Sequence, residues 1–157
     1  MKWTIAVAFA GAVITLPSLA ADVSYRGEIR PLINARCAEC HGDVSPTLAD
    51  FLIEPGKFKK EIVGPRLSSY SELLQLIGWP DTGALMRRLD DGTNTADKKP
   101  GNMYKHLGET EAERAANLTL VKAWLGAEGA WNLNRWENKG PVPAITKEQL
   151  DKLKLKY

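Results

Sequence analysis

The chain has 157 residues, of which 44% are hydrophobic and 25% are charged, and its formal net charge is +2 at neutral pH. This length suits a single domain with one core, and the composition gives no sign of disorder over most of the chain. No run of like charges is long enough to indicate nucleic-acid binding, and no internal repeat of useful period is present.

Residues 1–20 have the pattern of a secretory signal peptide. Lys2 precedes a nearly continuous apolar run over residues 3–16, Pro17 ends that run, and small residues follow at the expected cleavage position. The run is shorter than the ~20 residues that a membrane-spanning helix needs. We therefore expect cleavage near Ala20 and export of a chain that does not span the membrane, with an uncleaved N-terminal anchor as the alternative.

Residues 24–36 form the first predicted helix of the exported chain. Pro31 is tolerated in a first helical turn, so the regular part is expected over about residues 31–35. Ile29, Leu32 and Ile33 have the spacing of one apolar helix face. They are expected to lie in the core.

The stretch Cys37-Ala38-Glu39-Cys40-His41 follows this helix and has the Cys-x-x-Cys-His pattern that attaches a c-type haem. Each thiol can form a thioether bond to the haem, and His41 can bind the iron from one face. A thioredoxin-like pair would need a preceding strand, which the sequence does not indicate. A zinc site would need two more ligands, and His106 is the only other histidine. A disulfide would close only a very short loop. The motif therefore predicts one covalently bound haem c.

Residues 43–66 are rich in proline and glycine, which predicts a loop with a short turn near residues 47–53. Lys57, Lys59 and Lys60 form a small basic cluster in this loop. We interpret the cluster as a solvated surface, and a docking role is the alternative.

Three capping patterns predict the later helices. Ser69 and Glu72 form a capping box before a short apolar helix that Gly78 and Pro80 end. Asp81 is expected to cap a further turn over residues 83–89. Thr110 and Glu113 form a second capping box, which starts a helix over about residues 111–127.

The tail from residue 130 onward contains Trp131 and Trp136, so we expect an ordered wrap over the body. Thr146 is expected to cap a last short helix. The chain is thus divided into a signal peptide (1–20), a haem domain (21–129) and a C-terminal extension (130–157) packed on that domain. No alternating strand pattern stands out, which favours an all-α fold.

The sixth iron ligand can come from few residues, namely Met86, Met103 and His106. Met103 follows a loop that can cross a haem face, and it is the predicted distal ligand. Met86 has helical spacing with Leu85 and Leu89, which is more typical of core packing, so it is the alternative. His106 would give a bis-histidine iron of lower potential, and an open position is also considered.

On these motifs, over about residues 23–126, the chain resembles the class I monohaem c-type cytochromes that bacteria export. The resemblance implies an all-α, cytochrome c-like fold in which the first and last core helices cross beside the haem. It also implies Cys37 and Cys40 as thioether anchors and His41 and Met103 as axial ligands. The tail after residue 130 has no counterpart that we can place in that family.

The function implied is that of a periplasmic, monomeric single-electron carrier, not an enzyme, which shuttles electrons between redox partners such as other cytochromes, an oxidase or a reductase. Contact with these partners is expected to be transient, and Lys98, Lys99 and Lys105 flank Met103 as candidate docking residues. The alternative is a haem enzyme or a gas or redox sensor with an open or displaceable sixth site. The candidate partners of the haem propionates are Trp79, Arg66, Arg87 and Arg88.

Overall fold

The structure is a computed structural model that describes residues 22–95, 97–126 and 145–157. All regular elements within these residues are helical, which confirms the predicted all-α class. The predicted signal peptide, together with Trp131, Trp136 and the boundary at residue 130, lies outside the described residues. In chain order the elements are η1 (Tyr25–Ile29), α1 (Arg30–Arg36), α2 (Ala38–His41), α3 (Leu48–Ile53), α4 (Pro55–Lys60), α5 (Tyr70–Gln75), α6 (Ala84–Leu89), η2 (Tyr104–Leu107), α7 (Glu111–Leu125) and α9 (Lys147–Leu150).

The first helix opens with the π-helical turn η1 and continues directly as α1. Ser24 caps this start, because its side chain accepts a hydrogen bond from the backbone of Gly27, and Pro31 occupies the first turn of α1. The apolar stripe predicted here is buried, with Ile29 only 1% exposed. The helix therefore turns its apolar side to the core and ends where the cysteine motif begins.

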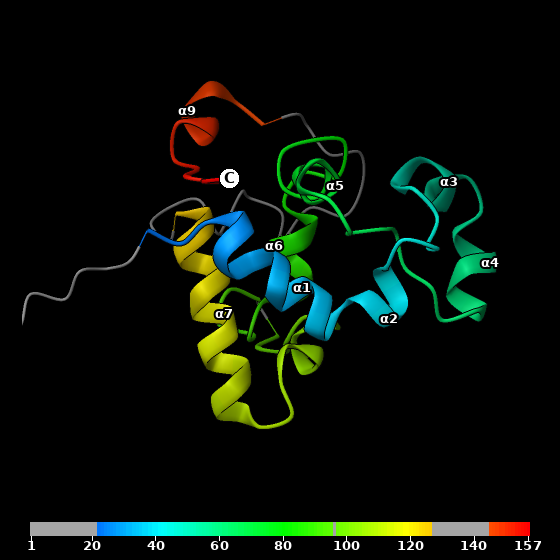
Figure 1. Cartoon of the computed structure of the whole chain (residues 1–157), viewed down its shortest axis with the longest axis horizontal. Coiled ribbons are helices and arrows are strands. Elements are labelled where there is room, and N and C mark those ends of the chain that lie inside the picture. The colour runs from blue at the N-terminus through cyan, green and yellow to red at the C-terminus, as the bar shows by residue number, and fades with distance from the viewer. Residues whose placement is uncertain (1–21, 96, 127–144) are drawn as a thin grey trace, which may run out of the picture.

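The longest helix, α7, forms where the second capping box predicted it. The side chain of Thr110 accepts a hydrogen bond from the backbone of Glu113, and the Glu113 carboxylate accepts one from the backbone of Thr110. The helix ends at Leu125, because Gly126 turns the chain with a φ of +93°. Figure 1 shows α7 beside η1 and α1, and α7 packs against η1.

The core lies between this helix pair and the middle of the chain. It is built from apolar side chains of η1, α1, α5, α6, η2 and α7, and Trp124 and Leu125 of α7 are completely buried. Burial of such side chains is the main favourable contribution to folding. None of the helices in the described ranges has both the length and the apolar character of a membrane span.

The segment after the cysteine motif forms a lobe beside this body. Figure 1 shows α3 and α4 at the side of α2 that faces away from α7. The predicted turn near residues 47–53 is the helix α3, capped by Thr47. The loop prediction is wrong for α4, because Pro55 occupies the first position of a helix, where its missing N–H costs no hydrogen bond.

The middle of the chain contributes α5 and α6. The capping box of Ser69 and Glu72 is present at the start of α5, as predicted. The prediction that Asp81 caps α6 is wrong, because Gly83 occupies the N-cap position with a left-handed φ of +72°. The Asp81 carboxylate instead lies 3.6 Å from Nη2 of Arg87.

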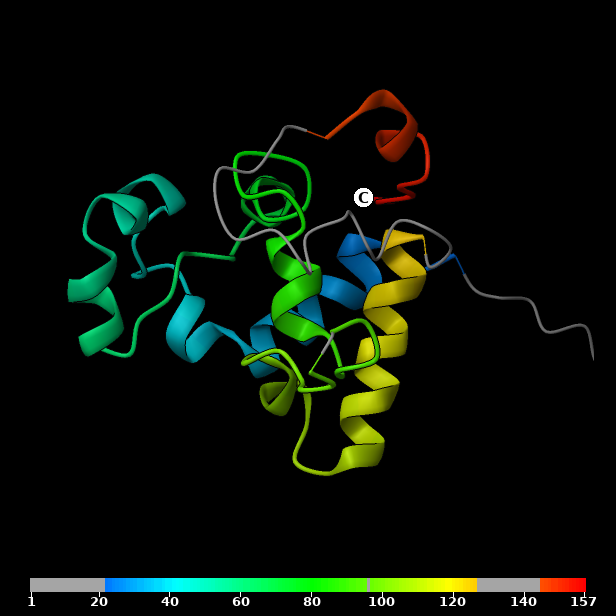
Figure 2. The ribbon, with the colours of Figure 1, turned by 180° about the vertical axis from the view of Figure 1, so that it is seen from behind.

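The end of the chain is tied to the start of the body. Thr146 caps α9 as predicted, and the residues that follow this helix bond to the body through backbone groups. Lys156 O accepts hydrogen bonds from Tyr25 N at 2.7 Å and from the Trp124 indole at 2.9 Å. In Figure 2 this last segment, in red, lies over the end of α7. Residues 145–157 therefore close the aromatic end of the core.

Candidate functional site

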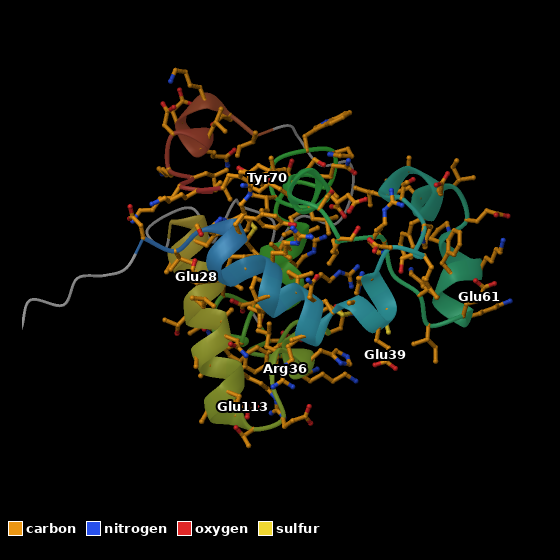
Figure 3. All side chains as sticks on the ribbon, in the orientation of Figure 1. Glu28, Arg36, Glu39, Glu61, Tyr70 and Glu113 are labelled. Carbon is orange, nitrogen blue, oxygen red and sulfur yellow. The ribbon has the colours of Figure 1, made fainter. Side chains whose placement is uncertain are left out.

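The cysteine motif occupies a single tight turn. The backbone N–H of Cys37 still donates to Ile33 O at 2.8 Å, so this residue closes α1 and also precedes α2. The backbone of His41 donates to Cys37 O at 2.9 Å. Glu39, labelled in Figure 3, points away from the body on the outer side of this turn. The local winding thus brings Cys37, Cys40 and His41 together in one helical turn.

Both thiols of this turn are free and half-buried. Burial and, to a smaller extent, the neighbouring thiol of Cys40 together raise the pKa of Cys37 to about 11. A thiol of a redox-active pair needs the opposite environment, one that lowers its pKa and exposes a thiolate. The arrangement is therefore unsuited to thiol–disulfide exchange.

The imidazole of His41 is held by residues 64–67, which lead the chain from the lobe back to the body and are called the returning segment below. Its Nδ1 lies 2.6 Å from the carbonyl oxygen of Pro65, and since a carbonyl can only accept, Nδ1 carries the proton. This is the backbone carbonyl partner expected for an iron-binding histidine. The bond leaves Nε2 as the nitrogen that can bind a metal.

The same returning segment fixes the position of His41 at two further points. Leu67 N donates to His41 O at 2.8 Å, and Gly64 N donates to Cys40 O at 2.9 Å. The ring lies directly against Gly64, where an added Cβ would be 2.0 Å from the ring carbon Cε1. The sequence analysis missed the role of Gly64 and Pro65, although their Gly-Pro pair marked a turn.

The protonation of His41 suits a ligand. Burial lowers its pKa, the hydrogen bond to Pro65 opposes that shift, and the charge of His106 lowers it further. The imidazole is therefore neutral at neutral pH.

The three candidates for the sixth iron position lie in different surroundings. Met86 is 1% exposed and is part of the core cluster of α6. Met103 is partly buried at the start of η2, and its backbone N–H donates to Arg88 O at 3.0 Å. His106 is exposed, one turn further along η2.

The four candidate propionate partners also differ. Trp79 is 63% exposed. Nε of Arg66 lies 2.5 Å from the Glu72 carboxylate, and Nη1 of Arg88 donates to Asn102 Oδ1 at 3.0 Å. Nη1 of Arg87 is buried and has no hydrogen-bond partner among the described residues.

The lysines proposed as docking residues are on the surface. Lys98, Lys99 and Lys105 are all exposed, and Lys99 lies 3.7 Å from the Asp97 carboxylate. In the lobe, Nζ of Lys57 lies 3.9 Å from the Glu54 carboxylate. A carboxylate therefore partly neutralises the positive charge near Met103, and another does so in the lobe. This agrees with the low net charge of the chain.

Comparison with known proteins places these features in a family. The family described as PccH cytochrome c matches residues 24–157. A solved structure, that of the monohaem cytochrome PccH from Geobacter sulfurreducens, is 47% identical in sequence and superposes with a TM-score of 0.72. The alignment covers 87% of this chain and 99% of that protein. The comparison with curated proteins found no match.

Proposed function

The chain belongs to the PccH cytochrome c family and is a monohaem c-type cytochrome with one covalently bound haem c. On this premise we propose that it is a periplasmic single-electron carrier whose iron is bound by His41 and Met103. The observation that carries the proposal is the fixed imidazole of His41, on the same helical turn as two free thiols. It supports a redox centre with one permanent protein ligand.

The donor set of the chain fits a covalently attached haem. Cys37 and Cys40 are the only cysteines in the sequence, so they are the thioether anchors that we propose. The Nδ1–H of His41 is used by Pro65, which fixes the ring plane and increases the basicity of the metal-binding nitrogen. Nη1 of Arg87 is buried and has no hydrogen-bond partner in the described part of the chain, which would suit an anionic carboxylate group of the cofactor.

Met103 is the better candidate for the second axial position. Met86 is packed against other apolar side chains of α6, and withdrawing it from the core would leave a cavity there. Met103 is only partly buried, and it lies at the start of η2, directly after a loop. Its thioether can therefore be contributed without loss of the core.

The bound haem supplies one-electron exchange between Fe(II) and Fe(III). Two permanent protein ligands would keep small molecules from the iron and leave only electron transfer through the cofactor edge. The soft sulfur of Met103 would favour Fe(II) and so raise the reduction potential relative to bis-histidine ligation. These properties suit a carrier and not a catalyst.

Location and partners follow from the same proposal. We propose that residues 1–20 direct export and are removed near Ala20, so that the haem is attached in the periplasm. The partners would be other redox proteins, bound transiently by a monomer through a small surface. The exposed lysines beside Met103 are the first docking residues to test.

The test is a matched pair of substitutions, Met103→Leu and Met86→Leu. Met103→Leu should abolish the weak absorption band at the red edge that marks Met–Fe(III) ligation, lower the reduction potential and allow carbon monoxide to bind. Met86→Leu conserves volume, so it should keep the band and cost less than about 1.5 kcal/mol of stability.

Two results would contradict the ligand assignment. Loss of the band in the Met86→Leu protein alone would make Met86 the distal ligand. Rapid binding of carbon monoxide or peroxide to the unaltered protein would favour the alternative, a haem enzyme or sensor with a displaceable sixth site.

A further inference from the structure

The turn that ends the lobe helix α4 contains a strained residue. Ile62 has a left-handed φ of +57°, and its N–H donates to Lys59 O at 3.3 Å. The N–H of Val63 donates to Phe58 O at 2.9 Å. Together these two bonds form the Schellman motif, in which glycine usually occupies the left-handed position. A β-branched side chain at that position costs free energy, because its Cβ crowds the backbone.

The fold itself does not use the side chain of Ile62. That side chain is 78% exposed, so packing within the chain offsets little of the cost of its conformation. Glycine would make the same turn without strain. Strained residues are concentrated where they have a function. An exposed isoleucine at a glycine position is therefore better explained by contact with another molecule than by the stability of this one.

Ile62 belongs to a set of exposed aliphatic side chains in the lobe. We call this set the lobe face, and each of its members is more than half exposed: Val44, Leu52, Ile53 and Ile62. Ser45, which follows Val44, donates from its hydroxyl to Cys40 O at 3.1 Å. Gly64, two residues after Ile62, donates from its N–H to the same oxygen at 2.9 Å. A molecule that covers the lobe face therefore lies beside the haem-attachment turn.

The other half of the lobe face is joined to this part by helix packing. Leu52 and Ile53 lie at the end of α3. The ring of Phe51 in α3 stacks on the ring of Phe58 in α4, with 5.9 Å between the ring centroids. Glu61, labelled in Figure 3, marks the end of α4 and directly precedes Ile62. The two lobe helices thus present their exposed aliphatic side chains from one packed unit.

The charges around the lobe face indicate what can cover it. Residues 43–62 carry four exposed carboxylates and three exposed ammonium groups, on Asp43, Asp50, Glu54, Glu61, Lys57, Lys59 and Lys60. A strongly acidic protein surface or an anionic lipid surface would repel the carboxylates, and a basic surface would repel the lysines. A second face of the same composition avoids both, because each sign can meet its opposite across the contact.

We propose that the lobe face is a transient contact between two copies of this protein, across which they exchange electrons. The proposal rests on the electron-carrier function proposed above and extends it to a further partner, a second copy. A stable protein interface buries about 1,600 Å², which is more than four aliphatic side chains on each copy supply. The contact is therefore weak, and the dilute protein remains a monomer.

The exchange is balanced without any further reactant. One electron passes from the Fe(II) haem of one copy to the Fe(III) haem of the other. No bond forms or breaks and no proton moves, so the two copies only interchange their oxidation states. Because the lobe is hydrogen-bonded to Cys40 O through Ser45 and through Gly64, contact between two lobe faces brings the two haem-attachment turns near each other.

The experiment measures the rate constant of electron self-exchange by NMR line broadening in mixtures of oxidised and reduced holoprotein. Ile62→Gly should lower this rate constant roughly tenfold, as expected when an aliphatic side chain is removed from a contact. The same variant should raise the urea midpoint of unfolding, because glycine adopts the left-handed conformation without strain. A residue with a purely structural role would not combine slower exchange with higher stability.

Two leucines of equal exposure provide the matched control. Leu52 in the lobe face and Leu150 in α9 are both 54% exposed, and Figures 1 and 2 show α9 far from α3 and α4. Leu52→Gln should lower the rate constant roughly threefold or more, and Leu150→Gln should change it by less than about twofold. Translational diffusion of the oxidised holoprotein, which involves no electron transfer, should slow from micromolar to millimolar concentration, and less so in Ile62→Gly.

Two results would overturn the proposal. One is a self-exchange rate constant that is unchanged in Ile62→Gly and Leu52→Gln, which would assign the lobe face to another partner. Binding to phosphatidylglycerol vesicles that both variants lose would then identify that partner as a lipid surface. The other is a urea midpoint that falls in Ile62→Gly, which would show that Ile62 stabilises its own chain.

A small inorganic oxidant separates this proposal from the carrier function. Electron transfer from the reduced holoprotein to hexacyanoferrate(III) needs no apolar contact, so it should be the same in the parent and in all three variants. Failure of this transfer in the parent would overturn the carrier function and the proposal together. Normal transfer with self-exchange that does not depend on the lobe face would overturn the proposal alone.

Discussion

The segments around His41 and Met103 are held by different means, although we propose both residues as iron ligands. His41 is fixed through its ring at Pro65 O, through its carbonyl at Leu67 N, and by close packing on Gly64. Met103 is placed by a backbone hydrogen bond to Arg88, and its side chain stays partly exposed. The His41 side chain is thus fixed by a hydrogen bond, whereas the Met103 side chain is held by partial packing on the core.

This difference teaches where each side of the site is sensitive. On the His41 side, the ring, the cysteine turn and the returning segment share their contacts, so a change in one displaces the others. On the Met103 side, the position of the sulfur depends on how firmly the loop is bonded to α6. Substitutions at the first should affect folding and cofactor attachment together, and those at the second should affect ligation more than folding.

The largest effect is expected for Gly64→Ala, which places a new side chain against the ring of His41. The new Cβ would meet the His41 ring at 2.0 Å, and the ring cannot move without losing its bond to Pro65. We expect a loss of about 3 kcal/mol in the free energy of unfolding. Urea unfolding of the holoprotein, followed by circular dichroism and by haem absorbance, measures it.

Gly56→Ala is the matched control for this loss. Gly56 lies in the lobe helix α4, and an added Cβ there would meet nothing within 4 Å. The exchange should change the free energy of unfolding by less than about 1 kcal/mol, and alanine favours the helix. Equal stability of the two variants would show that the returning segment can move to accommodate the new side chain. The surroundings of His41 would then be no more rigid than those of Met103.

Gly101→Ala tests the second side and should have an intermediate effect. The added Cβ would lie 2.3 Å from Arg88 O and 2.4 Å from Arg87 O, so the loop must move away from α6. We expect a loss of about 2 kcal/mol in stability, with a red-edge absorption band that weakens more than the Soret band does. If the band is unchanged while stability falls, the loop does not control Met103.

The smallest effect is expected for Glu72→Gln, which tests the support behind the returning segment. Burial raises the pKa of Glu72, but hydrogen bonds from Arg66 and Ser69 outweigh this and hold the pKa below its ordinary value. The stabilisation is therefore present at neutral pH and is lost as the pH falls through the lowered pKa of the folded state. The variant should lose about 1 kcal/mol at pH 7.

The same logic gives the pH signature of that variant. Because the unaltered protein loses its carboxylate charge in acid, the stability difference between Glu72→Gln and the parent should shrink towards about pH 3. Glu113→Gln, at the capping box of α7, is the exposed counterpart and should show a smaller difference at neutral pH. A difference that grows in acid would contradict the sign of the pKa shift.

Short sequence patterns predicted much of the fold. The capping boxes at Ser69, Thr110 and Thr146 lie within three residues each, and all three are present in the structure. The haem-attachment motif could also be recognised from the sequence, because its five residues are contiguous and continue directly from α1. Predictions failed where a residue type is common in two kinds of structure. Proline occurs both in loops and in the first turn of a helix, and Pro55 starts a helix in a segment predicted to be a loop.

The sequence by itself determined the covalent cofactor motif, the all-helical class and the capped helix starts at Ser69, Thr110 and Thr146, because each depends on residues a few positions apart. Only the tertiary structure decided that Gly64 and Pro65 hold the ring of His41, that Met86 lies in the core, and that Arg87 pairs with Asp81. These features depend on tertiary contacts between segments that are far apart in the chain. The spacing of residues along the sequence does not show which distant segments will come into contact.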